Sequence, residues 1–161
     1  MERKFVVAFD RNDQLPERRE WLSEAWGDVP TTHFQSDESM LDSIFIDLKI
    51  NKWELNAAWS SRQGLAPIIR IEILRDESLV EFVNNHASLI CDEVDAKVLM
   101  VFELEGESMD VDFIILMRLV AALCGRGRCY QWAEKLEFLD EKALADLPSS
   151  VELKDMLITC Q

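Results

Sequence analysis

The chain has 161 residues, a formal net charge of −14 and 48% hydrophobic residues. A chain of this length forms one domain and buries roughly 70% of its unfolded surface, so its fold needs neither disulfides nor a structural metal. The hydrophobic fraction excludes a disordered acidic tail, and the negative charge excludes the usual sequence-independent nucleic-acid binder, which must neutralise phosphates with Lys and Arg.

The first part of the chain predicts a strand, a helix and an irregular segment. β-Branched and aromatic residues favour a strand over 3–9. Asp13 and the acidic residues that follow it are typical of a helix start, and Gly27 is placed to end that helix. The polar segment 28–42 contains one short candidate strand, Thr31–Gln35.

Residues 43–75 carry the clearest pattern, an alternation of apolar and polar side chains with a period of two. This alternation predicts three strands, at 44–50, 53–59 and 69–73. Asn51 and Lys52 form the only candidate turn between the first two strands, and two residues suit a hairpin. Short connections of this kind predict a three-strand antiparallel meander with one face exposed to solvent.

The remaining elements alternate between helices and strands. The pattern predicts a helix at 77–93, a central strand at 97–105, a helix of about 14 residues from Asp110 to Gly125, a strand at 128–133, a short helix from Asp140, and a last helix opened by a capping box at 149–152. This order predicts a single α+β domain over residues 1–161, with a mainly antiparallel sheet packed by helices.

The end of the predicted central strand and the residues after it hold five carboxylates and no base. Glu103, Glu105 and Glu107 are two residues apart, so they project from the same face of a strand. Asp110 and Asp112 suit the start of a helix, where the dipole favours negative charge. Besides a solvated strand end, two interpretations stay open: an acidic docking surface for a partner, or a Mg²⁺ site at the two aspartates with a nearby Glu. We expect these five residues to bind a partner.

The four cysteines are expected to be reduced thiols. Cys124 and Cys129 are separated by four residues, wider than C-x-x-C, and no second pair of ligands lies at zinc-finger distance. The glycines between them suit the end of a helix. An anion site built from three nearby arginines, Arg118, Arg126 and Arg128, stays open. We expect no metal and no cofactor.

No catalytic motif selects a site in this chain. His33 and His86 are the only histidines, so a Cys–His or Ser–His pair must use one of them, and no G-x-S-x-G elbow points to a nucleophile. His86 lies among apolar residues of a predicted helix, which favours a hydrogen-bonded core or boundary position. The 31 acidic residues offer many carboxylate pairs without a spacing that selects one.

Taken together, these features predict a cytosolic protein that binds another protein. The sequence starts without the apolar run of a signal peptide, and no run approaches the ~20 residues that span a bilayer. In profile the chain resembles the immunity proteins of polymorphic toxins: small, acidic, α+β and without an active-site motif. That resemblance implies that the chain covers the active site of a basic toxin or effector. From the composition, the charge and the lack of a long apolar run we expect a monomer or homodimer, with no nucleic acid or membrane as partner. The alternatives are a chaperone similar to acidic type III secretion chaperones, or an enzyme with an unrecognised carboxylate site.

Overall fold

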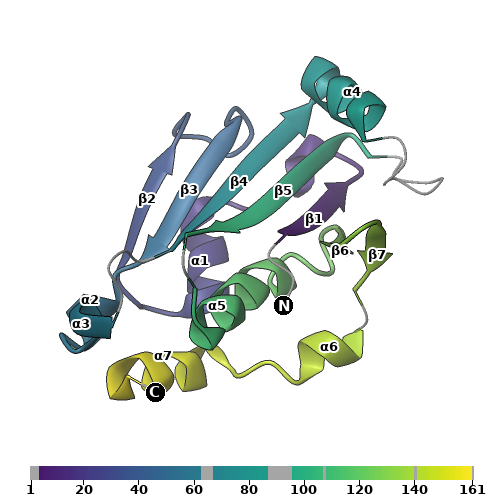
Figure 1. Ribbon diagram of the computed structural model, residues 1–161. Helices are drawn as coiled ribbons and strands as arrows, with labels where there is room; N and C mark the ends of the chain where they lie inside the picture. The colour runs from purple at the N-terminus through teal and green to yellow at the C-terminus, as the bar shows by residue number, and fades with distance from the viewer. Residues whose placement is uncertain (1–3, 63–66, 87–95, 107, 140, 161) are drawn as a thin grey trace.

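The computed structural model describes residues 4–62, 67–86, 96–106, 108–139 and 141–160. Its centre is a seven-stranded antiparallel sheet with the strand order β2-β3-β4-β5-β1-β6-β7 (Figure 1). The strands are β1 (Lys4–Phe9), β2 (Thr31–Gln35), β3 (Phe45–Ile50), β4 (Ile68–Arg75), β5 (Val98–Glu105), β6 (Arg128–Trp132) and β7 (Leu136–Phe138).

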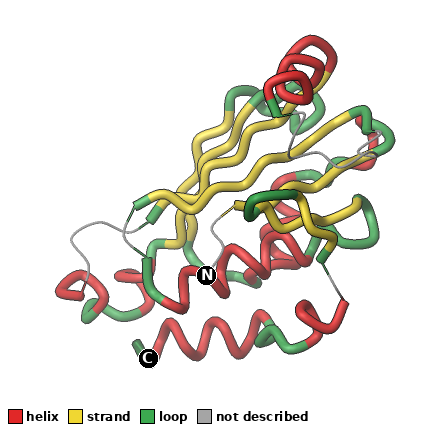
Figure 2. The backbone as a smooth tube through the Cα atoms, turned by 45° about the vertical axis from the view of Figure 1, so that its right-hand side comes forward, coloured by secondary structure: helices red, strands yellow, loops and turns green. Residues whose placement is uncertain are grey.

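Most of the helices lie on one side of this sheet, and α4 lies on the other side at one end (Figures 1 and 2). The helices are α1 (Arg18–Trp26), α2 (Lys52–Leu55), α3 (Trp59–Arg62), α4 (Asp76–Asn85), α5 (Asp110–Ala121), α6 (Glu141–Ala145) and α7 (Ser150–Thr159), with a 3-10 turn at Asn12–Gln14. We call the side that packs against α1, α5 and α7 the inner face, and the opposite side the outer face.

The inner face carries the main core. Alternate strand residues point inward and are buried, among them Phe5, Val7, Ile46, Leu48, Ile71, Met100 and Phe102. Three buried indole N–H groups tie the helices to one another: Trp21 donates to the carbonyl of Leu119 at 3.0 Å, Trp26 to that of Ile115 at 2.9 Å, and Trp59 to that of Leu157 at 2.7 Å. Each of these three buried indole groups therefore has a hydrogen-bond acceptor.

The outer face is covered only in part. A smaller core forms beneath α4 from Val6, Ala8, Leu74 and Leu99, with Leu79 and Phe82 of the helix packed on it. Within the described residues, no helix lies over β2, β3 and the first half of β4 on this face (Figure 1). An antiparallel sheet tolerates one solvated face, so this part of the sheet stays accessible to a partner.

The predicted fold class is confirmed, because the domain is α+β with an antiparallel sheet and a three-strand meander. The meander consists of β2, β3 and β4, however, and the prediction of a strand at 53–59 was wrong. That segment forms α2 and α3, since Lys52 and Trp59 are buried against the helical layer. The short strand β7 was not predicted, and residues 87–93 of the predicted helix 77–93 lie outside the described residues.

Several local predictions agree with the structure. The first helix ends at Gly27, which has a φ of 70° that favours glycine. It begins later than predicted, because Asp13 belongs to the 3-10 turn and the carboxylate of Glu17 accepts the hydrogen bond of the first helical turn. Ser149 and Glu152 form the predicted capping box of α7, with reciprocal bonds of 3.1 and 3.2 Å. Strand β5 is the central strand, as its two-sided apolar pattern predicts.

Candidate functional site

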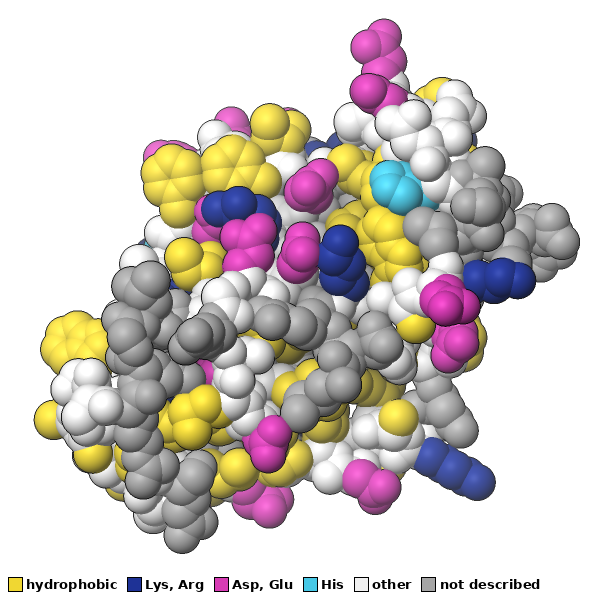
Figure 3. Space-filling view, viewed as in Figure 1, with side chains coloured by type: hydrophobic (Ala, Val, Ile, Leu, Met, Phe, Trp, Pro, Cys, Tyr) yellow, Lys and Arg dark blue, Asp and Glu magenta, His cyan; other side chains and the backbone are white. Residues whose placement is uncertain are grey.

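The uncovered part of the outer face is the first candidate site, and we call it the open sheet face. It brings side chains from five strands to one surface: Lys4, Phe34, Phe45, Asp47, Ile68, Arg70, Glu103 and Glu105. Figure 3 shows this side of the molecule, where acidic and basic side chains lie close together and hydrophobic groups flank them. The surface is therefore a mixture of charged and apolar groups on a sheet.

The charges of the open sheet face are linked across the strands. Arg70 on β4 is paired with Asp47 on β3 and with Glu105 on β5, each at 3.2 Å. The two carboxylates raise the pKa of the Arg70 guanidinium. On the next strand along, Lys4 lies 3.7 Å from Glu103. These pairs place positive and negative charges in alternation across the strands. Exposed ion pairs contribute little to the stability of a fold, so the arrangement is better suited to recognition of a partner with the complementary pattern of charges.

Apolar side chains frame the charges. The Phe34 ring stacks on Phe45 with 5.7 Å between the ring centroids, and 66% of Phe34 is exposed. Ile68 is also exposed, at 39%. A large aromatic side chain held on a strand loses little entropy when it is buried by a partner, which makes it a typical interface anchor.

The structure separates the five carboxylates that were predicted to bind a partner. Glu103 and Glu105 lie on the open sheet face, as their alternation predicts. Asp110 is exposed at the start of α5, and Glu107 lies outside the described residues. Asp112 is only 2% exposed, so it does not belong to an accessible surface.

Asp112 has a structural role at the junction of two helices. One carboxylate oxygen pairs with Nζ of Lys52, which is itself buried, and the other accepts the backbone N–H of Met109 at 2.8 Å. Nζ of Lys52 also lies 5.0 Å from the centroid of the Trp59 ring. The predicted turn at Lys52 is therefore an anchor between α2 and α5, and Asp112 is unavailable to a partner or to Mg²⁺.

The acidic segment contains no base of its own, but the fold places two bases beside it. Lys4 and Arg70 supply the bases from β1 and β4, far away in the sequence. Phe34 was not among the predicted site residues, because it lies within the polar segment 28–42, most of which was predicted to be irregular. Its only sequence signal was the short candidate strand at Thr31–Gln35, which is β2.

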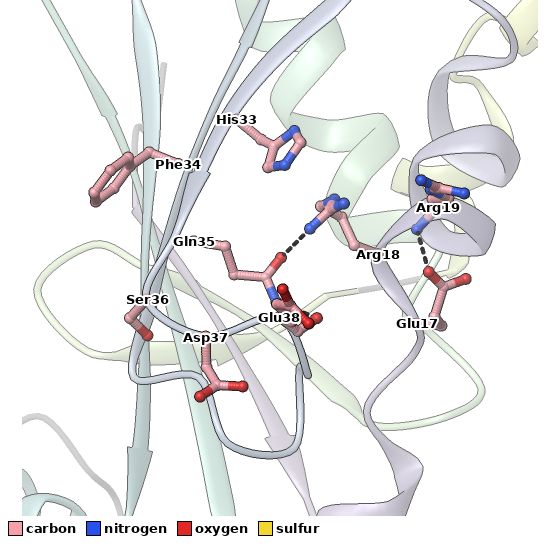
Figure 4. Close-up of a pocket in the computed structure, with 9 residues that line it drawn as sticks. All are labelled: Glu17, Arg18, Arg19, His33, Phe34, Gln35, Ser36, Asp37 and Glu38. Atoms are coloured by element: carbon pink, nitrogen blue, oxygen red, sulfur yellow. Dashed lines mark hydrogen bonds between the residues drawn. The ribbon is translucent and has the colours of Figure 1, made fainter.

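The two histidines occupy different environments. Nδ1 of His86 lies 2.9 Å from the carbonyl oxygen of Phe82, and its ring packs on Phe82 and Trp132, a boundary position as predicted. His33 lies on β2 and lines a surface cavity between that strand and α1 (Figure 4). Burial and the positive charges of Arg18 and Arg19 lower the pKa of His33.

The cysteine segment shows no ligand site. Cys124, Cys129 and Cys160 are free thiols, and Cys91 lies outside the described residues. Sγ of Cys124 and Sγ of Cys129 lie 3.6 and 3.7 Å from the same carbonyl oxygen, that of Val120. The hydrogen bond between the two thiols and burial raise the pKa of Cys129.

Two of the three arginines considered for an anion site already have partners. Arg118 donates to the carbonyls of Ala25 and Glu24 at 2.9 and 3.0 Å, which ties α5 to the end of α1. Arg128 pairs with Asp10 at 2.8 Å. Among the described residues, no group of three or more His, Cys, Asp or Glu side chains is placed to hold a metal ion.

Comparison of the chain with protein-family models, with curated proteins and with solved structures finds no match in any of the three. Over the part of the chain that the structure describes, no helix has the length and apolar character needed to cross a membrane.

Proposed function

We propose that the protein binds another protein through the open sheet face and acts as an inhibitor or immunity protein that covers a basic partner. The observation that carries this proposal is the exposed Phe34, stacked on Phe45 beside the fixed charges of Asp47, Arg70 and Glu105. An aromatic anchor next to ordered charges has the composition of an interface centre, where aromatic residues and Arg contribute most of the binding energy.

The overall charge supports a basic partner. The net charge of −14 attracts a positively charged protein over long distances and raises the rate of encounter. Near contact, the alternating charges of the open sheet face select the orientation of the partner, because like charges that meet across an interface weaken the wrong complexes. A partner whose active site is basic is then blocked by the same contact.

We expect replacement of Phe34 by alanine to weaken the complex by about 2–4 kcal/mol, equal to about 30- to 700-fold in affinity, as for a central interface residue. The experiment immobilises the wild-type chain and the Phe34→Ala variant, captures partners from the cells that produce the protein, and measures the affinity of the purified partner for each. The activity of the partner is then assayed with and without the wild-type chain.

Val151 supplies a matched control. It is 69% exposed on α7, on the helical side of the molecule, so Val151→Ala removes apolar surface of similar exposure away from the open sheet face. The proposal requires that this variant binds like the wild type. Equal capture by the Phe34 and Val151 variants would place the interface elsewhere, and a partner that binds without losing activity would contradict the inhibitor role.

Charge reversal tests the nature of the partner. We expect the double variant Glu103→Lys and Glu105→Lys to slow association with a basic partner by tenfold or more at low salt. The difference should shrink at high salt, since the Debye length falls from ~10 Å at 0.1 M to ~3 Å at 1 M. Stopped-flow or surface-binding kinetics over a salt series measure this effect.

The control for charge reversal is Glu20→Lys with Glu24→Lys, which changes the net charge equally at exposed positions on α1. Both double variants should remain folded, because exposed ion pairs contribute little to stability. If both slow association equally, only the net charge matters and the open sheet face has no special part. If neither does, the partner is not basic.

A further inference from the structure

Two thiols that are separated by four residues in the sequence are neighbours in the structure. Cys124 follows α5, and Cys129 lies on β6. Their Sγ atoms lie 3.6 and 3.7 Å from the carbonyl oxygen of Val120, in the last turn of α5, and the two thiols hydrogen-bond to each other. The two sulfur atoms are therefore adjacent, and both are free thiols.

The segment between the two cysteines is held against the sheet. The N–H groups of Arg126 and Gly127 donate to the carbonyl of Leu123 at 3.1 and 3.0 Å, which closes a tight turn after α5. At Gly127 the backbone approaches β1 so closely that a Cβ atom would lie 2.8 Å from the carbonyl oxygen of Ala8. Glycine permits this contact because it has no side chain. The packed turn keeps the two thiols close to each other.

The two thiols differ in their access to solvent. Cys129 is only 3% exposed and belongs to the main core on the inner face, whereas Cys124 is partly exposed. The hydrogen bond with Cys129 lowers the pKa of Cys124, while this bond and burial raise the pKa of Cys129. Cys124 is thus the thiol that more readily becomes a nucleophilic thiolate, and Cys129 keeps its proton.

We propose that Cys124 and Cys129 form a site of reversible oxidation, at which a hydroperoxide converts the two free thiols into a disulfide. The proposal rests on three observations: the two sulfur atoms are adjacent, one of them is accessible, and the other is buried behind it. An accessible thiol that reacts first and a second thiol poised to resolve the product are the arrangement found in redox-responsive cysteine pairs.

The oxidation takes two steps. The thiolate of Cys124 attacks one oxygen of the hydroperoxide, the O–O bond breaks, and the departing hydroxide or alkoxide takes up the proton that the Cys124 thiol released, which leaves a sulfenic acid. The sulfur of Cys129 then attacks the sulfur of Cys124, the S–O bond breaks, and the departing hydroxide takes the Cys129 proton to form water. Two thiols are oxidised, and the hydroperoxide is reduced to water and, for an organic hydroperoxide, an alcohol.

The charge of the chain favours a small neutral oxidant. Hydrogen peroxide is uncharged, so the net charge of −14 does not repel it from the partly exposed Cys124. Glutathione disulfide is larger and negatively charged, and an acidic chain repels it. We therefore expect hydrogen peroxide to oxidise the pair faster than glutathione disulfide does at the same concentration.

Tryptic mapping identifies the bond, because trypsin cleaves after Arg126 and Arg128 and so separates the two cysteines. The full chain is treated with a tenfold molar excess of hydrogen peroxide, alkylated under denaturing conditions and digested. We expect mass spectrometry to find peptide 119–126 joined to peptide 129–135, at the sum of the two masses less two hydrogen atoms. Dithiothreitol should separate the two peptides, and the untreated chain should show both thiols alkylated.

Variants assign the part of each thiol. In Cys129→Ser the sulfenic acid has no resolving thiol, so we expect dimedone to label Cys124 at least tenfold more than in the wild type. In Cys124→Ser the remaining thiol is buried, so we expect its oxidation to be at least tenfold slower. Cys160→Ser is the matched control, because it removes a buried thiol at the end of α7 and should leave the linked peptides unchanged. Circular dichroism shows whether each variant is folded.

Five results would overturn the proposal. They are the absence of the linked peptides after peroxide treatment, a bond that joins other cysteines instead, oxidation of Cys124→Ser as fast as that of the wild type, faster oxidation by glutathione disulfide than by hydrogen peroxide, and equally fast bond formation in the urea-unfolded chain. The last result would mean that the fold does not prepare the pair. The assay needs no partner protein, and the pair faces the inner side of the sheet, so its outcome is independent of the proposed role of the open sheet face.

Discussion

Replacing Asp112 by alanine should lower the free energy of unfolding by about 3–5 kcal/mol, the usual loss when one member of a buried ion pair is removed. The change leaves the ammonium group of Lys52 buried, with only 3% of that residue exposed. It also removes the acceptor for the backbone N–H of Met109 at the start of α5. Urea unfolding followed by circular dichroism measures the effect.

A double variant separates the ion pair from packing. Lys52→Met with Asp112→Leu replaces both charges by apolar groups of similar size, and such replacements are often neutral or stabilising. We expect this variant to be more stable than Asp112→Ala alone. A double variant that is as unstable as the single one would show that the hydrogen bond at Met109 or the shape of the side chains is the main contribution, not the buried charge.

Replacing Arg75 by alanine should lower the free energy of unfolding by about 2–4 kcal/mol, since hydrogen bonds from a charged donor contribute more than neutral ones. The Arg75 guanidinium donates to the carbonyls of Ser43 and Met40 at 2.5 and 2.8 Å, and its Nε donates to Oδ1 of Asn12 at 2.6 Å. Three segments therefore meet at one side chain at the end of β4. Burial lowers the pKa of this group without removing its charge.

The lysine variant is the control for Arg75. Lysine keeps the positive charge but lacks the planar fork that serves several acceptors, so Arg75→Lys should lose more than half of the stability that Arg75→Ala loses. Because Arg75 holds the segment that joins β2 to β3, both variants should also expose this segment to limited proteolysis. A lysine variant as stable as the wild type would mean that the charge alone is sufficient.

Local patterns predicted most elements of the fold, and the errors occur where distant residues decide the structure. The alternation of β3 and β4 and the apolar first half of β5 each identify a strand from neighbouring residues. The segment after β3 alternates too, yet it forms α2 and α3 because Lys52 pairs with Asp112 and Trp59 donates to Leu157. Neither partner is visible from the local sequence.

The candidate site was predictable in part for the same reason. The spacing of Glu103 and Glu105 predicts that they share one face of a strand, and they do. Their pairing with Lys4 and Arg70 depends on the strand order, which local periodicity does not contain. The exposure of Phe34 likewise depends on its position on the part of the outer face that no described helix covers.

The position of β1 has a consequence for how the chain folds during synthesis. β1 lies between β5 and β6, with Lys4 opposite Glu103 and Phe5 opposite Gln131. Ribosomes add about 5–20 residues per second, so about 5–20 s separate the synthesis of β1 from that of its first partner strand. The meander of β2, β3 and β4 has local contacts and can form in that interval. The strand that completes the centre of the sheet is thus made first and inserted late, and its apolar residues have no partner strand until β5 is synthesised.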